Sequence, residues 1–300
     1  MGLTYALAIV LPIATFFFLA FAVLEDSGYL PRLAVMLDRT FRAMGLNGKA
    51  VLPMILSLGC DTMATTATRI LDTRRERVQV TLLLALGVPC SAQLGVVLGM
   101  LAGVGALATG LWALVLVLVI LAVGFVANQV LEGHRSDFIL ELPPLRRPSL
   151  SNILVKTLAR VEWYLKEVVP IFLLGTAALF ALDRLGAIAL LTDALRPVVT
   201  GWLGLPPAAT TAFLMGFLRR DYGAAGLYAL VQAGALSGAQ ILVSLVVITL
   251  FVPCIANLMM IVKEHSGKTA AAVAAFVFPF AFFVGGILNL LLDATGLMRL

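Results

Sequence analysis

Long stretches of the chain carry no charged side chain, and these stretches decide what it can fold into. Four of them lack Asp, Glu, Lys and Arg altogether: 3–24, 78–131, 222–262 and 269–292. A transmembrane helix needs ~20 mostly apolar residues, so the second and third stretches are long enough for two helices each. The sequence therefore predicts an integral membrane protein with an all-α fold, a polytopic helical bundle.

The overall composition supports this prediction, because 61% of the residues are hydrophobic, 12% are charged and the mean hydropathy is +1.06. Soluble domains are far more polar. Shorter apolar runs at 50–60, 168–182 and 198–218 are interrupted by Gly, Pro or an ionisable residue, which predicts broken or tilted segments. We expect about eight spans in all. The run 3–24 lacks a basic flank and a cleavage site, so it predicts a retained helix rather than a signal peptide.

The net charge is +5, and the basic residues lie in short loops between apolar runs. This distribution indicates membrane topology rather than nucleic-acid binding. One basic cluster lies at 69–77 and another in the central segment 132–166, and the hairpin 78–131 should return the chain to the same, cytoplasmic, side. Segments 32–43 and 150–166 alternate charged and apolar residues, which predicts amphipathic helices at the lipid surface. We expect lipid, and no nucleic acid, as a partner.

A short motif occurs twice and marks two related halves. Residues 88–94 and 252–258 share the pattern V-P-C-x-A-[QN]-L. Asp61 precedes the first copy and Asp221 the second, each between apolar segments. Duplicated halves with discontinuous helices are the usual architecture of secondary transporters. We therefore expect two pseudo-repeated halves, 1–131 and 167–300, joined by a cytoplasmic loop with an amphipathic segment at 132–166.

The two prolines of the repeat, Pro89 and Pro253, should break their helices and leave backbone carbonyls that lipid cannot hydrate. A passing cation would supply a partner for them. The adjacent thiols of Cys90 and Cys254 would add further ligands. The alternative is that helix packing, hydroxyl side chains or a trapped water satisfies each break.

A third thiol, Cys60, lies between Gly59 and Asp61. A carboxylate near the bilayer centre costs roughly 3 kcal/mol, so Asp61 indicates a function unless it pairs with Arg69. Asp221 follows two arginines, and a self-contained Arg–Asp pair is the alternative there. The cysteines are odd in number and lie in apolar surroundings, which argues against a disulfide framework.

Thiol, carboxylate, amide and carbonyl groups together suit a borderline transition metal better than Mg²⁺ or Ca²⁺, and Zn²⁺, Mn²⁺ or Cu(I) would fit almost as well as Fe²⁺. The predicted metal path consists of Cys60, Asp61, Cys90, Gln93, Asp221, Cys254 and Asn257. The predicted helix-breaking residues are Gly59, Pro89 and Pro253.

Motifs over nearly the whole chain resemble the membrane part of FeoB-type ferrous iron transporters, whose two halves are called Gate regions. They include L-E-D-S-G-Y at 24–29, G-L-N-G-K at 45–49, G-C-D at 59–61, C-S-A-Q-L at 90–94 and G-F-L-R-R-D at 216–221. This resemblance implies Fe²⁺ import across the bacterial cytoplasmic (inner) membrane by a multi-pass protein, with Cys60, Cys90 and Cys254 lining the path. Fe²⁺ would be the transported substrate, without a permanently bound cofactor.

The sequence departs from the family pattern at four positions: Asp61 stands for Asn, Met63 for Pro, Gln93 for Arg and Asp221 for Glu. The first and third changes make the path more attractive to a cation, or indicate a somewhat different metal. The family also carries a GTPase domain with a G-x-x-x-x-G-K-[ST] loop, which this sequence lacks: the segment 266–269 ends like one, but Val262 stands where its first glycine belongs.

We therefore expect a transporter and not an enzyme, with possible partners in a separate GTPase subunit, a small accessory protein and further copies of the chain. His134 and His265 show no catalytic spacing. Two alternatives stay open: a Gate-type transporter of another solute, such as a different divalent metal or a nucleoside, and a non-transporting membrane subunit that docks a partner through 132–166.

Overall fold

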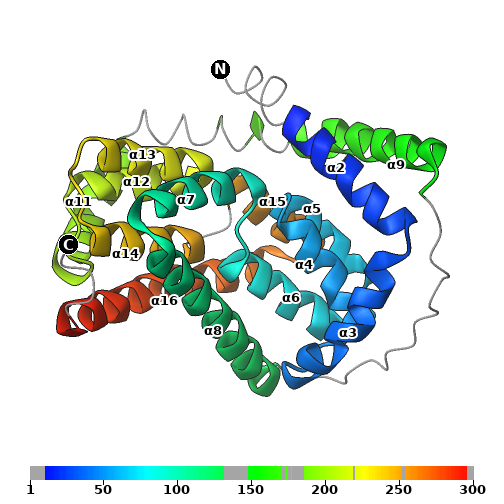
Figure 1. Cartoon of the computed structure of the whole chain (residues 1–300), viewed down its shortest axis with the longest axis horizontal. Coiled ribbons are helices and arrows are strands. Elements are labelled where there is room, and N and C mark those ends of the chain that lie inside the picture. Colours follow the sequence, from blue (N-terminus) through cyan, green and yellow to red (C-terminus); the bar gives the residue numbers. More distant parts are fainter. Residues whose placement is uncertain are drawn as a thin grey trace. The chain divides into compact units, whose positions relative to one another are not determined.

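Apolar runs without charges form helices, as the sequence predicts (Figure 1). The computed structural model describes residues 11–131, 148–170, 173–174, 177, 186–218, 220–251 and 254–295. Throughout these residues the regular secondary structure is helical and includes no strand. The all-α prediction is therefore confirmed.

Contacts within the chain define two compact units. The first contains residues 1–84 and 122–176, and the second contains residues 85–121 and 177–300. Helices α6 (Arg74–Gly87) and α8 (Ala106–Val130) each begin in one unit and end in the other. The predicted boundaries at 131 and 167 follow the sequence repeat rather than these contacts, and they stay a prediction.

Four helical segments of the described residues are long and apolar enough to cross a membrane: 74–104, 106–130, 238–264 and 267–295. The first and third are broken where the V-P-C motif occurs, into α6 and α7 (Ser91–Val104), and into α14 (Gly238–Leu250) and α15 (Ile255–Glu264). The second is α8 and the fourth is α16 (Gly267–Thr295). The broken helices are thus confirmed within a multi-pass membrane protein.

Two further apolar runs form helical pairs instead of spans, which is one reason why four spans rather than eight are found among the described residues. In the first unit α4 (Val51–Ser57) packs on α5 (Asp61–Ala67), and in the second α12 (Ala208–Leu218) packs on α13 (Arg220–Gln232). At 1.5 Å per residue, none of these helices reaches the ~30 Å of a hydrocarbon core. The predicted runs 3–24 and 168–182 lie partly outside the described residues.

The order of these elements repeats along the chain. A helical pair that breaks just before an aspartate is followed by a span that breaks at Pro-Cys, and then by an unbroken helix of 25 or 29 residues. Asp61 is the first residue of α5, and Asp221 is the second residue of α13. The prediction of two pseudo-repeated halves is consistent with this order.

In the first unit α2 (Leu11–Asp26) lies along α9 (Leu150–Trp163), which continues into the π-helical turn η4 (Tyr164–Val168) (Figure 1). Glu25 accepts hydrogen bonds from Arg160 and, at 3.1 Å, from Lys156. Burial works to raise the pKa of Glu25, but these two cations outweigh it and hold the pKa below its ordinary value. The cations of α9 therefore face α2, and its leucines 150, 154 and 158 are exposed. The helix is amphipathic as predicted, with its apolar face outward.

The remaining helices of the first unit are α3 (Tyr29–Ala43) and the short turns η2 (Gly48–Ala50) and η3 (Thr68–Ile70). Helix α3 buries Leu30, Ala34 and Phe41 and exposes Arg42, so it too is amphipathic, as predicted. Buried Asp38 accepts a 2.9 Å hydrogen bond from the Gly48 backbone N–H, which ties the end of α3 to η2.

In the second unit α14 is buried from Ile241 to Leu250 and packs on α7, α12, α13 and α16. Phe213, Phe251 and Phe282 form an aromatic cluster at its end, with ring centroids 5.3 to 6.3 Å apart. Helix α11 (Ala187–Pro197) and the π-helical turn η5 (Val198–Trp202) also belong to this unit. The core of the second unit is therefore built around the broken span of the second half.

Candidate functional site

All three cysteines occupy the same local position, the residue immediately before a helix begins. Cys60 precedes α5, Cys90 precedes α7 and Cys254 precedes α15. Their carbonyls accept the first helical hydrogen bond, at 3.0, 2.8 and 3.0 Å from the backbone N–H four residues later. All three are thiols and are partly exposed. The three thiols thus share one local setting, at the N-terminal end of a helix.

The break between α4 and α5 holds Asp61 in a defined place. The Ser57 hydroxyl, on the other side of the break, donates a hydrogen bond to Oδ1 of Asp61, and both residues are buried. Gly59 lies between them against α2, where a Cβ would stand 2.2 Å from the ring of Phe17. Only glycine allows α2 to approach so closely. Besides its predicted role as a helix-breaking residue, Gly59 leaves the space that the Phe17 ring occupies.

Arg220, the first residue of α13, is 3% exposed and donates to the end of α6. Its Nη2 lies 3.0 Å from the carbonyl oxygen of Ala85, and its Nη1 lies 3.0 Å from that of Val88. Ala85 is four residues before Pro89. In an unbroken helix, the backbone N–H at position 89 would donate to the Ala85 carbonyl, but proline has no N–H. The guanidinium thus replaces the N–H that Pro89 lacks.

At these carbonyls we expected a passing cation or, as the alternative, helix packing, a hydroxyl side chain or a trapped water. For Asp221 the alternative to a metal contact was a self-contained pair with an arginine. The structure gives Arg220 two backbone acceptors in the other half of the chain. The side chain of Asp221 lies outside the described residues, so its predicted role in the metal path stays a prediction.

Gln93 bonds a helix end at the second break, although not the carbonyl four residues before the proline. It is fully buried, and its Nε2 donates a 2.9 Å hydrogen bond to the carbonyl oxygen of Ile248, in the last turn of α14. Its Oε1 is also buried and has no hydrogen-bond partner among the described residues. Asn257, which is likewise fully buried, occupies the same position in α15 that Gln93 occupies in α7. Pro253 itself lies outside the described residues.

The predicted path residues fall into both units. Cys60 and Asp61 belong to the first, and Cys90, Gln93, Asp221, Cys254 and Asn257 belong to the second. Within either unit, the described residues include no group of three or more His, Cys, Asp or Glu side chains that could hold a metal. A cation passing through one unit would therefore meet few thiols or carboxylates at a time, and amide or carbonyl oxygens would complete its coordination.

Sequence reasoning missed Ser57 and the role of Arg220. Arg220 stands one residue before Asp221, just as Cys60 stands one residue before Asp61. An arginine at the position that carries a predicted path thiol in the other half was therefore a signal visible in the sequence.

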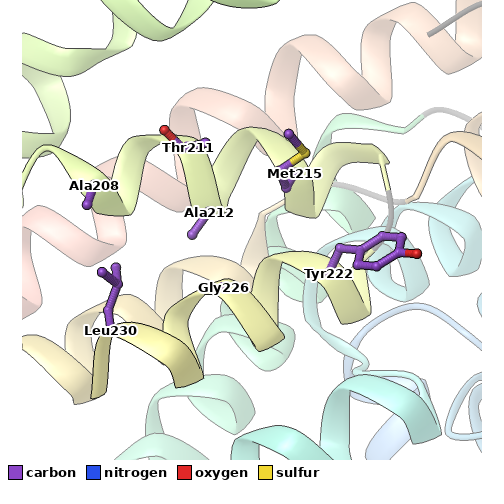
Figure 2. Close-up of a pocket in the computed structure, with 7 residues that line it drawn as sticks. All are labelled: Ala208, Thr211, Ala212, Met215, Tyr222, Gly226 and Leu230. Carbon is purple, nitrogen blue, oxygen red and sulfur yellow. The ribbon is translucent and has the colours of Figure 1, made fainter. Parts of the chain in front are cut away.

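A pocket of about 180 Å³ opens between α12 and α13 (Figure 2). It is lined by Ala208, Thr211, Ala212, Met215, Tyr222, Gly226 and Leu230. Figure 2 shows the first four on α12 and the other three on α13. The lining offers two hydroxyls and one aromatic ring, and no thiol, amide or carboxylate. This lining does not suit a metal ion, and the pocket is smaller than the ~300 Å³ typical of small-molecule sites, so it does not suit a nucleoside either.

Two family models match the sequence. The Gate model, described as nucleoside recognition, matches residues 7–104 and 165–268, which is more than half of the chain. The model described as ferrous iron transport protein B C terminus matches residues 110–160. No solved structure matches the chain.

Curated relatives carry the name Fe(2+) transporter FeoB. One from Legionella pneumophila (strain Lens) is 35% identical over 204 residues, which cover 63% of this chain and 26% of the relative. One from Methanocaldococcus jannaschii is 26% identical over 321 residues, covering 95% of this chain and 48% of the relative. One from Staphylococcus aureus (strain COL) is 27% identical over 309 residues, covering 91% and 46%. The chain thus spans between about a quarter and half the length of these relatives.

Proposed function

Because this chain belongs to the Gate family, and to the FeoB-type membrane module within it, we propose that it forms the path by which ferrous iron is imported across the bacterial cytoplasmic membrane. The relatives are named as Fe(2+) transporters, and the chain has four helical segments that can cross a membrane. We propose for this chain the Fe²⁺ transport that the names of those relatives state.

The observation that carries the proposal is the matched construction of the breaks. At each Pro-Cys motif a half-helix that ends in carbonyls meets a half-helix that begins at a thiol. Carbonyl oxygens, amide oxygens and thiolates are together the ligands that a borderline metal such as Fe²⁺ accepts. Discontinuous helices of this kind form the cation sites of many transporters. Cys60, Cys90 and Cys254, with Gln93 and Asn257, would therefore line the path.

Asp61 would attract the cation at the tip of the α4–α5 pair. Its side chain is buried and accepts a hydrogen bond from Ser57, which fixes its direction. An acidic side chain within a membrane protein indicates a functional site by default. We assign Asp61 the role of contacting Fe²⁺ as it passes, and we assign the same role to Asp221.

The membrane potential supplies one source of energy for this import. At an inside-negative potential it favours inward movement by ~2.3 kcal/mol per charge per 100 mV, hence by about 4.6 kcal/mol for Fe²⁺ at 100 mV. A GTPase supplied by another polypeptide would then control opening rather than drive the ion. A small accessory protein and further copies of the chain would complete the assembly.

Uptake into proteoliposomes tests this function. The purified chain is reconstituted with an inside-negative potassium diffusion potential, and radiolabelled Fe²⁺ under anaerobic conditions is compared with a radiolabelled nucleoside. We expect saturable iron uptake that grows with the potential, and nucleoside uptake no higher than in empty liposomes. Nucleoside uptake without iron uptake would favour the other Gate-type function. Absence of both, also after addition of a FeoB GTPase domain, would refute a transport path in this chain.

A further inference from the structure

Helix α2 contacts both the Cys60–Asp61 break and helix α9, and it does so with one line of side chains. Phe17, Phe21 and Glu25 are spaced four residues apart, so they lie one above the other along the helix. At 1.5 Å per residue, Phe17 and Glu25 are about 12 Å apart along the axis. This line of three side chains therefore bridges two places within the first unit.

At the break, the ring of Phe17 occupies the space beside Gly59, since a Cβ at Gly59 would stand 2.2 Å from the ring. Gly59 immediately precedes Cys60, so this contact determines where the thiol lies. On the other side of the thiol, Met63 in the first turn of α5 packs against the hydrophobic cluster that α2 forms with the π-helical turn η4. The break is thus held against α2 from both sides.

At α9, Arg160 contacts the same line of side chains twice. Its Nη2 donates a hydrogen bond to Glu25, and its guanidinium lies over the ring of Phe21, 5.1 Å from the ring centroid. Phe21 in turn stacks on Phe17, with ring centroids 6.2 Å apart and an interplanar angle of 25°. Contacts therefore run from the guanidinium through two rings to the break, along one rigid helix.

Two features indicate that the junction of α2 and α9 can rearrange. Nη1 of Arg160 is buried and has no hydrogen-bond partner among the described residues, which costs free energy in this arrangement. Helix α9 also passes directly into the π-helical turn η4 after Trp163, and such turns are frequent at functional sites. The ion pair at this end of α2 is thus not a fully satisfied, rigid contact.

We propose that α9 sets how far the Cys60–Asp61 break opens, and that α2 transmits this setting. Phe17 is then a positioning residue, because it contacts Gly59 beside the break rather than the ion. A shift of α9 that releases Glu25 withdraws the Phe17 ring and exposes the thiol. This inference rests on the proposed function, because it assigns a control to the iron path at Cys60.

Alkylation of Cys60 reports the opening of the break without using iron. The purified chain in lipid nanodiscs is treated with N-ethylmaleimide under anaerobic conditions, and each cysteine is followed by peptide mass spectrometry. Cys90 and Cys254 belong to the second unit and serve as internal controls for an intact fold. Phe17→Ala should raise the rate at Cys60 roughly fivefold, because it loosens the local packing. Phe16→Ala, which removes a ring that is 75% exposed on the same helix, should not.

A double-mutant cycle separates transmission along α2 from two independent local effects. Glu25→Gln removes the charge at the far end of the line and should also raise the rate at Cys60. If α2 transmits this effect through the Phe17 ring, the double variant should react no faster than Phe17→Ala alone. Glu162→Gln, in an exposed ion pair of α9, should leave the rate at Cys60 unchanged.

An unchanged Cys60 rate in Glu25→Gln, or effects that multiply in the double variant, would overturn the inference. Neither result touches the proposed function, which iron uptake by the wild type decides separately. If Phe17→Ala raises the rates at all three cysteines, the variant is unfolded, and Phe17→Leu takes its place in the cycle.

Discussion

The packing of α12 against α13 gives a quantitative prediction, because Gly223 on α13 lies directly on the backbone of α12. A Cβ at Gly223 would stand 2.5 Å from the Cα and 2.8 Å from the N of Gly216. Carbon atoms in favourable contact lie about 3.5–4.0 Å apart, so Gly223→Ala must move the two helices apart by about 1 Å. These two atoms of Gly216 belong to the backbone and cannot rotate away.

Gly216→Ala is the matched control on the facing helix. A Cβ there would meet Ile248 at 3.4 Å and Gly223 at 3.5 Å, which are ordinary contacts. Both substitutions gain about 1 kcal/mol from helix propensity, so this gain cancels in the comparison. The remaining difference is the overpacking cost of Gly223→Ala, about 1–3 kcal/mol.

Thermal unfolding of both variants in the same detergent checks the prediction. We expect Tm to fall for Gly223→Ala by several degrees relative to Gly216→Ala. Because Arg220 begins the same helix, the separation should also loosen its hydrogen bonds to α6. Equal Tm values for the two variants would refute the close approach of α12 and α13.

Three further substitutions test other contacts. Gln93→Leu removes the donor to the Ile248 carbonyl, which should cost about 1–3 kcal/mol and lower Tm. Glu25→Gln should increase hydrogen exchange in α9 at neutral pH, whereas Glu162→Gln, in an exposed pair, should not. Since the folded pKa of Glu25 is lowered, its stabilisation is present above about 4.5 and is lost as pH falls further, so the wild type should show the same increase in acid. Asp61→Asn should keep the Ser57 contact and reduce the rate of iron uptake.

The helices and their breaks could be predicted because their causes are local. Uncharged apolar runs form helices in a membrane, and Pro89 interrupts its helix through its own missing N–H. The sequence repeat likewise predicted the correspondence between Gln93 and Asn257, which the structure places at equal positions in α7 and α15. These features need no knowledge of what packs against them.

The partners of the breaks could not be predicted, because they come from distant parts of the chain. Arg220 bonds Ala85 across 135 residues, and Gln93 bonds Ile248 across 155. The orientation of α9 was also beyond reach: its alternation of charged and apolar residues predicts two faces, but only the acidic end of α2 decides that the cations turn inward.

Apolar runs too short to span were the third difference. The run 198–218 predicted a broken or tilted segment but not a helical pair: the run is broken, and its main helix, α12, ends at Leu218 and packs on α13. A sequence does not distinguish the two outcomes, because both bury the same apolar side chains. In each helical pair the second helix begins with a buried polar side chain, Asp61 in α5 and Arg220 in α13.

The most direct test of a thiol-lined iron path is anaerobic uptake of radiolabelled Fe²⁺ by the wild type and by the triple variant Cys60→Ser, Cys90→Ser, Cys254→Ser, reconstituted at equal protein content. We predict saturable uptake by the wild type and background flux in the variant, with matching size-exclusion profiles. Equal, saturable uptake by both proteins would contradict the account, because iron would then cross without the cysteines.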